Sequence, residues 1–597
     1  MHDLLISGAT IVDGTGAAPY TADVAVSHGR ITEVGRVSGA AQRSIDAAGA
    51  HLLPGFVDIH THYDGQASWD ETFTPSIHHG VTTLVMGNCG VGFAPVRPGQ
   101  QAQLIDLMQG VEEIPESVLT EGMRWGWESF GEYTRALDRM PHSLDFMALV
   151  PHDALRLYVM GERAARGEVA SDGDLRQMHG LLRAALADGA AGFSLGSTET
   201  HRTGSGHMTP SFQVSGHEMN TLATAFHGLP YRVLQAVDDF SATRGDPREE
   251  KARFDREYAK IETMAQVAGQ PVAISWMDRV FAPRQSDWLA EAALHSAQRG
   301  VDVRLACAPR GVGTLSGLDT TMNPFIAFPG YREIMQLPPA ARAAAMRNPE
   351  RRALVLSQTP IKLAVPGSSM PPVLDFVIAH FDQLAMDMFP CVEVDGSMDY
   401  EPERSTSLGA MAQAQGVRPI EVMYDFLSAG DGSNFIYYPI YNYTTGDLSK
   451  VHDMLLHPKA LYSLADGGAH VGTICDASSS TTLLAHWALQ RTRGPRIPLA
   501  QVVEMLTRRN ARFMGLADRG VIAPGMKADL NLVQLDQLAL PLPQIVRDLP
   551  AGGRRIVQKS RGYLATFVSG QAVIENGEIT AARPGRWVRG PGATGAA

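Results

Sequence analysis

The chain has 597 residues, enough for a large hydrophobic core and more than one domain. Hydrophobic residues make up 44% and charged residues 19%, which is the composition of an ordinary globular protein. The formal net charge of −12 argues against a nucleic-acid backbone or an anionic membrane surface as the main partner.

Targeting and disulfide signals are missing from the sequence. The first residues, MHDLLISGATIVDG, are typical of a strand rather than a signal peptide, and no run approaches the ~20 apolar residues of a membrane helix. The four cysteines lie far apart without CxxC spacing, so a disulfide framework is not expected. We therefore expect a cytoplasmic protein.

The two ends of the chain show the same pattern of predicted secondary structure. Residues 1–52 read as short strands joined by turns, and residues 516–597 repeat this pattern. Because chain termini often lie close together, the two segments are predicted to form one small β-sandwich domain.

Between them, residues 53–515 alternate apolar runs with helical patterns such as 174–189 and 287–300, both of which end in glycine. This alternation predicts an α/β fold, a (β/α)₈ TIM-like barrel. The predicted strands are 55–60, 81–86, 144–150, 191–195, 231–237, 271–275, 301–306 and 461–466. Two long segments, about 97–142 and 310–460, exceed the minimal unit, and we expect them to cover the active-site mouth.

The most informative motif is GFVDIHTHYDG at 55–65. Alternate side chains of an extended chain point to the same side, so His60 and His62 are predicted to face one point at the end of a strand. Neutral imidazole pairs are good ligands for zinc and similar ions. A metal at the end of a buried strand suggests hydrolysis by an activated water.

Reactive groups of such barrels lie at the C-terminal ends of the strands. Reading those ends along the chain adds Cys89, His152, His201 and Asp466, with His470 one turn further on. Asp466 suits the role of a carboxylate that takes a proton from water and hands it to a leaving amine. The histidines at 152 and 201 have an equally good interpretation as structural residues.

These motifs together resemble the amidohydrolase superfamily, and within it the group of N-acyl-D-amino-acid deacylases. The resemblance spans nearly the whole chain and is carried by LLPGFVDIHTHYDGQ, HHGVTTLVMGNCGVGFAP, ADGAAGFSLG, LADGGAH and TRRNARFMGLADRGVIAPGMKADLNLV. It implies a metal-dependent hydrolase of an amide or related C–N bond. It also implies that His60 and His62 bind metal, that Cys89 binds or bridges metal, and that Asp466 is both ligand and general base.

The sequence departs from the group at the ends of the fifth and sixth predicted strands. The group supplies a further histidine from each, whereas these ends read VLQAVDDF and VAISWMDR. Asp238 or Asp239 stands near the first missing histidine and Trp276 takes the place of the second; tryptophan cannot ligate a metal. One firm zinc site is therefore expected, and a second zinc site stays open.

Three hypotheses follow. The first is a zinc-dependent hydrolase of an N-acyl (D-)amino acid or similar small amide, with the substrate carboxylate bound by His201, Arg202 or Arg310, with His152 also near the substrate. The second is a cyclic amide or imide hydrolase, and the third a metal-free ligand-binding pseudoenzyme. Superfamily resemblance makes a homo-oligomer the expected assembly.

Overall fold

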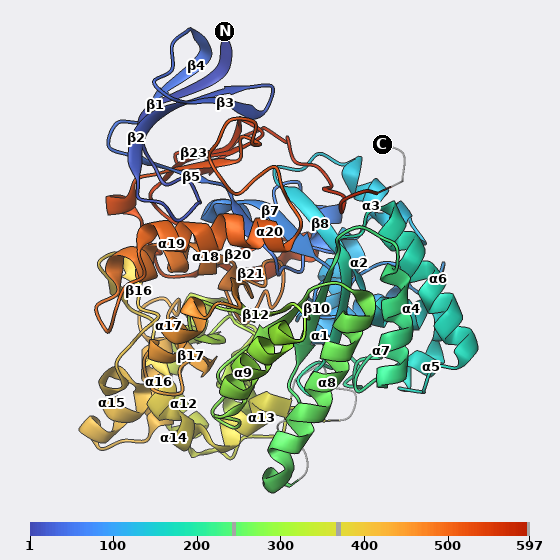
Figure 1. The fold of residues 1–597 in the computed structure, drawn as a ribbon. Coiled ribbons are helices and arrows are strands. Elements are labelled where there is room, and N and C mark those ends of the chain that lie inside the picture. The colour runs from blue at the N-terminus through green and yellow to red at the C-terminus, as the bar shows by residue number, and fades with distance from the viewer. Residues whose placement is uncertain (242–245, 366–371, 594–597) are drawn as a thin grey trace.

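The computed structural model describes residues 1–241, 246–365 and 372–593. Its centre is a parallel eight-stranded sheet rolled into a nearly closed barrel, as predicted (Figure 1). The strand order around the barrel follows the chain order, from β6 to β12 and then β18. The strands are β6 (Phe56–Asp58), β7 (Val81–Met86), β8 (Asp145–Pro151), β9 (Gly192–Ser197), β10 (Val233–Asp238), β11 (Val272–Trp276), β12 (Val303–Cys307) and β18 (Ala460–Tyr462).

All eight predicted strands are confirmed, although the last is shorter than expected. The prediction ran to Asp466, but β18 ends at Tyr462. Leu464 and Asp466 have positive φ values of 62° and 45°, which a regular strand does not allow. The chain thus leaves the sheet just before the carboxylate of interest.

Helices cover the outside of the barrel, and their buried faces pack against the strands. Serine caps begin α6 and α7, whose Oγ atoms accept from the N–H groups of Asp174 and Glu218, and glycines in left-handed conformations end α6 and α8. The main covering helices are α4 (His152–Met160), α6 (Asp172–Asp188), α7 (Gly216–Ala223), α8 (Glu250–Ala268), α9 (Gln285–Gln298), α17 (Ser449–Leu456) and α19 (Leu499–Glu504).

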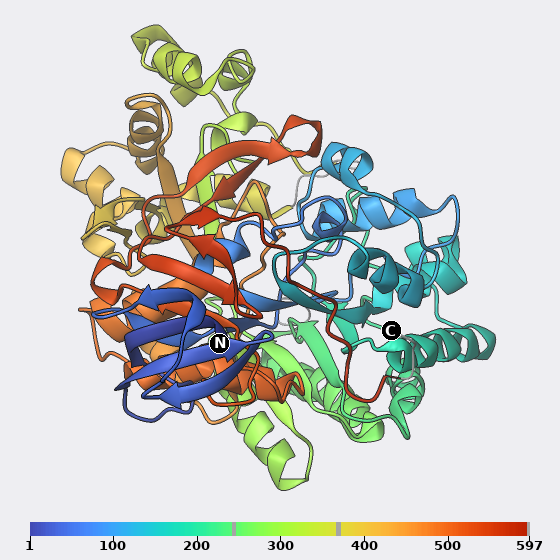
Figure 2. The same ribbon diagram turned by 90° about the horizontal axis from the view of Figure 1, so that it is seen from above.

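The two chain ends build one mixed nine-stranded sheet with its own apolar core. Its N-terminal strands lie beside the C-terminal ones in Figure 2, and β5 pairs with β19 to join the two halves. The strands are β1 (His2–Ile11), β2 (Tyr20–Ser27), β3 (Arg30–Gly35), β4 (Ala41–Asp46), β5 (His51–Pro54), β19 (Leu530–Val533), β22 (Tyr563–Val568), β23 (Gln571–Glu575) and β24 (Glu578–Ile579).

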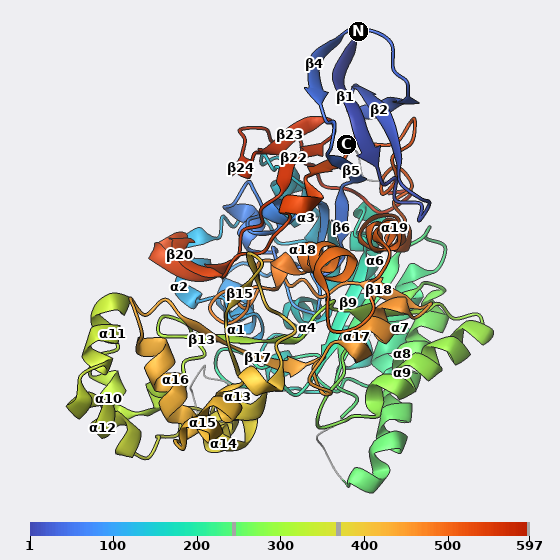
Figure 3. The same cartoon turned by 90° about the vertical axis from the view of Figure 1, so that its left-hand side faces the viewer.

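Two excursions follow barrel strands. The first contains α1 (Gln101–Val111), α2 (Glu116–Gly122) and α3 (Phe130–Asp138). The second carries a small sheet of three strands, β13 (Val312–Gly317), β17 (Phe435–Tyr441) and β14 (Phe389–Pro390). It also has a hydrophobic core of its own, to which helices contribute, among them α11 (Pro339–Met346), α12 (Pro349–Ser357), α15 (Leu408–Gln415) and α16 (Pro419–Ser428). Figure 3 places this second excursion at the end of the barrel opposite the N-terminal sheet.

Asn510 closes the barrel between its first and last strands. Its Nδ2 donates to the carbonyl oxygens of Val57 in β6 and Tyr462 in β18, at 2.8 and 2.9 Å, and the side chain is fully buried. We expect Asn510→Ala to lower the free energy of unfolding by about 1–3 kcal/mol, because two buried carbonyls lose their donor. Urea denaturation checks this, and a change below the measurement error would contradict it.

In the part of the chain that the structure describes, no helix combines the length and apolar character that crossing a membrane requires.

Candidate metal centre

The extensions of β6 and β18 place the first two histidines. Beyond the strand, the Thr61 N–H donates to the Val85 carbonyl at 3.0 Å, and the His62 N–H donates to the Gly467 carbonyl at 2.8 Å. The Asp466 N–H donates to the His60 carbonyl at 3.1 Å. The backbone thus holds His60, His62 and Asp466 at one end of the barrel, as expected for the C-terminal ends of parallel strands.

Four donor atoms gather there, from His60, His62, Cys89 and Asp466, which we call the metal-ligand cluster. His60 Nε2 lies 3.3 Å from Cys89 Sγ and 3.3 Å from Asp466 Oδ1. Asp466 Oδ1 also lies 3.7 Å from His62 Nε2. Among the described residues, His60, His62 and Cys89 form the one group of three or more potential ligands whose donor atoms all lie within 4.8 Å of one another.

The separations between these donors fit a zinc ion. Zinc bonds of about 2.0–2.1 Å to nitrogen and about 2.3 Å to sulfur put neighbouring tetrahedral donors about 3.3–3.6 Å apart. The two 3.3 Å contacts lie at the lower end of this range, and the 3.7 Å contact lies just above it. Nitrogen, sulfur and carboxylate donors are also the types that zinc prefers.

The ionisable groups in and around the metal-ligand cluster also favour a cation. Burial raises the pKa of both Asp58 and Asp64 to about 7, against the lowering effect of backbone hydrogen bonds and of His62, and it raises the pKa of the Cys89 thiol well above its usual range. Glu112, Asp466 and Asp64 add to the shift at the thiol. This concentration of buried acids favours binding of a divalent ion, which would deprotonate a coordinating thiol.

His60 and Asp466 already have the protonation states that metal ligands need. Burial lowers the pKa of His60 to about 4, so its imidazole is neutral at pH 7. Burial raises the pKa of Asp466, but the hydrogen bond from His62 and the charge of His60 outweigh it and hold that pKa well below its usual range. A neutral imidazole and an ionised carboxylate are both competent ligands.

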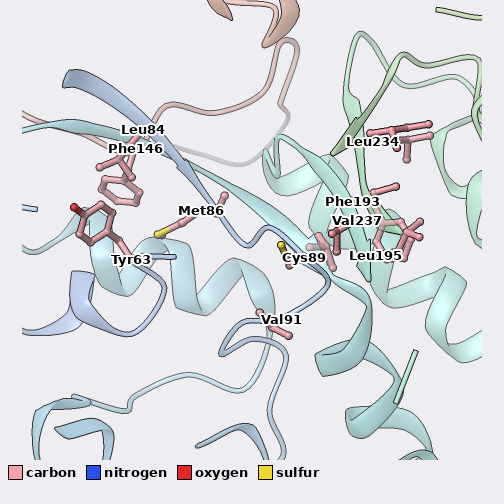
Figure 4. Packing of buried hydrophobic residues seen from close by; sticks show 14 of the residues in the cluster. Tyr63, Leu84, Met86, Cys89, Val91, Phe146, Phe193, Leu195, Leu234 and Val237 are labelled. Atoms are coloured by element: carbon pink, nitrogen blue, oxygen red, sulfur yellow. The ribbon is translucent and has the colours of Figure 1, made fainter. Parts of the chain in front are cut away.

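Cys89 is held by a strained turn after β7. Its φ of 57° is unusual for a residue with a side chain, and Asp466 and His470 also have positive φ values. The Cys89 N–H donates to Gln235 Oε1 at 2.9 Å. Figure 4 shows Cys89 next to the ends of neighbouring strands, near Leu195 and Val237. Strained residues of this kind cluster at functional sites, because the surrounding structure must stabilise them.

Two more histidines lie beside the cluster in opposite charge states. Burial lowers the pKa of His201 to about 3, and the charges of His470 and His62 lower it further. Burial also lowers the pKa of His470, but Glu113, Glu112 and Asp466 outweigh it and raise that pKa to about 10. At neutral pH the site therefore combines a neutral imidazole with an imidazolium, a separation typical of acid–base sites.

Two predicted substrate residues have structural partners instead. His152 Nε2 contacts Glu218 Oε1 at 2.9 Å, and the guanidinium of Arg156 contacts the same carboxylate. Arg310 is fully buried; it pairs with Asp476 at 2.8 Å, donates to Ser478, Thr482 and the Cys475 carbonyl, and stacks on Tyr400. These contacts give both side chains a structural role, although His152 Nδ1 and Arg310 Nε have no hydrogen-bond partner among the described residues. Their binding of substrate stays a prediction.

Arg202 lies in the turn after His201, where its Nη1 donates to the Gly206 carbonyl at 3.3 Å. Its side chain is half-buried, and no carboxylate partner is found for it among the described residues. Of the two arginines proposed for a substrate carboxylate, Arg202 is thus the one with an unpaired charge.

At the ends of β10 and β11, Asp238, Asp239 and Trp276 do not lie where the family's two further histidines were expected. Trp276 points out of the barrel, where its Nε1 donates to the Ser286 carbonyl and its ring packs on His457. Side chains alternate along a strand, so Ser275 is the barrel-facing residue at that end. Asp238 and Asp239 accept backbone N–H bonds of their own turn and of Glu199.

Gln235 lies on the barrel-facing side of β10, where it lines a small cavity with His60 and Asn88. Gln235 Nε2 and Ser275 Oγ are buried without a hydrogen-bond partner among the described residues. An amide and a hydroxyl thus stand on the barrel-facing sides of these two strands, and neither is a usual zinc ligand.

Sequence reasoning missed Glu112 and Glu113. They follow α1 in the first excursion, and Glu112 Oε1 lies 3.2 Å from His62 Nδ1. One signal was present in the sequence: two adjacent acids between apolar Val111 and Ile114 at a helix C-terminus, where the helix dipole disfavours negative charge.

Comparisons with known proteins identify the family of the chain. A model of the amidohydrolase family matches residues 43–360 and 367–574. N-acyl-D-aspartate deacylase and D-aminoacylase of Alcaligenes xylosoxydans xylosoxydans are 37% and 35% identical over 196 residues. Each match covers 33% of this chain and 36% or 38% of the relative, so the matched segment spans little more than a third of these curated relatives.

Two solved structures share the fold over nearly the whole length. A crystal structure of D-aminoacylase has a TM-score of 0.62 at 21% identity and covers 99% of this chain and 100% of its own. N-acyl-D-glutamate deacylase from Bordetella bronchiseptica, solved with zinc and a phosphonate inhibitor, has a TM-score of 0.62 at 22% identity, covering 98% and 99%. On the match of the family model to most of its length, the chain belongs to the amidohydrolase family.

Proposed function

We propose that this protein is a metal-dependent hydrolase of a C–N amide bond in an N-acyl (D-)amino acid or a similar small amide. The observation that carries the proposal is the metal-ligand cluster, in which His60 Nε2 lies 3.3 Å from both Cys89 Sγ and Asp466 Oδ1. His60, His62, Cys89 and Asp466 would hold one zinc ion. When bound, such an ion lowers the pKa of a water to about 7 and polarises the amide carbonyl.

Asp466 is the proposed general base and acid. Its Oδ1 contacts both histidines, so we assign the proton transfer from the attacking water to Oδ2. The side chain is 15% exposed, so it faces the site rather than bulk solvent. The same carboxyl group would then protonate the leaving nitrogen, as general acid–base catalysis requires.

The charged rim of the site supports an anionic substrate. His470 is 26% exposed and carries a positive charge up to about pH 10. Because His470 pairs with Glu112 and Glu113, we assign the carboxylate of an N-acyl amino acid to Arg202, which has no carboxylate partner among the described residues. His201, neutral above about pH 3, would contribute a hydrogen-bonding nitrogen.

Elemental analysis of the purified protein and a substrate panel test this proposal. We expect about one zinc-like ion per chain, hydrolysis of N-acyl-D-amino acids, and no turnover by His60→Ala, because that variant loses a ligand. His295→Ala, which lies in α9, is the matched control and should keep full activity. Normal turnover by metal-free protein would rule the proposal out.

The same panel and the zinc analysis also test the two alternatives, a cyclic amide hydrolase and a metal-free ligand-binding protein. Cyclic imides and lactams belong in it, since the altered ends of β10 and β11 would suit a substrate of different shape. A rate confined to those compounds would make the protein a cyclic amide hydrolase. Failure to bind zinc even after reconstitution would favour the metal-free ligand-binding protein.

A further inference from the structure

We propose that Glu112 is a positioning residue that sets the metal affinity of His62, so that the excursion after β7 completes the metal centre. The inference rests on the proposed function, because it assumes that His62 binds metal. It goes further by assigning a role to a residue outside the barrel strands and outside the metal-ligand cluster.

The first observation is a contact between two buried atoms. His62 Nδ1 lies 3.2 Å from Glu112 Oε1, and the side chains are only 1% and 2% exposed. Neither atom has a hydrogen bond of standard geometry to any described residue. Each atom thus offers the other a partner at hydrogen-bond distance, and a hydrogen bond between them would satisfy both.

The chemistry of metal ligation explains the pairing. His62 Nε2 faces Asp466 and the rest of the cluster, so a metal at Nε2 requires the hydrogen to reside on Nδ1. A carboxylate that accepts this hydrogen selects the correct tautomer, fixes the orientation of the ring and makes the imidazole a better donor. Glu112 is the carboxylate at that position.

The second observation is that Glu112 is itself held in place. Its carbonyl accepts the His470 N–H at 2.5 Å, and its Oε2 lies 3.6 Å from His470 Nε2. His470 Nδ1 lies 3.4 Å from Glu113 Oε2 on the other side. Both Glu113 and His470 have left-handed backbones, with φ of 54° and 47°. The loop after β18 and the first excursion therefore contact each other next to the Nδ1 side of His62.

Zinc affinity, measured by competition with a chromophoric chelator, tests the role. We expect Glu112→Ala to weaken zinc binding about 10- to 100-fold, the usual effect of losing such a partner. Glu112→Gln should lose less, because its amide oxygen still accepts the Nδ1 hydrogen. Glu116→Gln, on an exposed residue of the same excursion, should bind zinc like the parent protein.

Two further measurements separate positioning from general stability. Cobalt-substituted Glu112→Gln should keep the sulfur-to-cobalt absorption band of a Cys89 ligand, and its urea midpoint should stay close to that of the parent. His470→Gln, which loosens Glu112 without touching His62, should weaken zinc binding less than Glu112→Ala does. Unchanged zinc affinity in Glu112→Ala would overturn this inference but leave the proposed function standing. A parent protein that binds no zinc would overturn the proposed function.

Discussion

Asp466→Asn should lower kcat about 10²- to 10⁴-fold while the protein still binds zinc. The substitution keeps an oxygen donor near His60 and His62 but removes the group that takes and returns a proton, and general acid–base catalysis typically contributes a factor of this size. Steady-state kinetics on the best substrate of the panel, with metal content measured on the same sample, checks the result.

The matched control is Asp453→Asn. Asp453 lies in α17, and its side chain is 80% exposed, so its loss should leave kcat and metal content unchanged. If Asp466→Asn kept more than a tenth of the parent kcat with full zinc content, Asp466 would be a metal ligand only and another residue would have to act as the base.

Glu401→Ala should destabilise the protein by about 3–5 kcal/mol, the cost of breaking one side of a buried ion pair. Glu401, in the second excursion, accepts two hydrogen bonds from Arg491, at 3.0 Å each, and one from the Leu448 N–H at 2.8 Å. His486 Nε2 contacts the same carboxylate at 3.0 Å. Arg491 is 2% exposed and would be left buried without its anion. The urea midpoint and limited proteolysis of the second excursion measure the effect.

The pH dependence of this effect has a definite sign. Burial raises the pKa of Glu401, but the bonds from His486, Arg491 and Leu448 outweigh it and lower the pKa to about 2. A depressed folded-state pKa adds stability that is fully present above the unfolded value of about 4.3 and is lost as the pH falls towards 2. The stability gap between the parent and Glu401→Gln should therefore shrink from pH 5 to pH 3.

Glu403→Ala provides the comparison. This residue lies two positions away on an exposed turn, where its carboxylate accepts from the Ser405 hydroxyl, and surface changes of that kind stay within about 0.5 kcal/mol. A loss in Glu401→Ala no larger than in Glu403→Ala would show that the ion pair does not hold the excursion to the barrel.

The architecture of the barrel was predictable from local pattern. Short apolar runs indicate strands, and helical periodicity that ends in glycine indicates helices, because both depend on short-range interactions. All eight barrel strands lie where this alternating pattern predicts them. The HTH pair was predictable for the same reason, since the two-residue period of a strand places His60 and His62 on one side.

Long-range contacts decided the rest. The predicted strand 461–466 ends early because the turn that aims Asp466 requires left-handed residues, which no strand pattern reveals. Trp276 lies on the outer face of β11, and only the register with the neighbouring strands shows that Ser275 faces inward. Arg310 and His152 are equally attractive on paper, but tertiary packing gives each of them a buried carboxylate partner.

By itself, then, the sequence determined the fold class and the projection of His60 and His62 to one side, because strand periodicity is a local property. It offered Cys89 and Asp466 as candidate ligands through the family resemblance. The tertiary structure alone decided that these four donors meet, and that Glu112 arrives behind His62 from a separate excursion. The physical reason is distance along the chain. Glu112 lies 50 positions after His62 and Asp466 lies 404 positions after His62, so packing rather than local pattern brings them together.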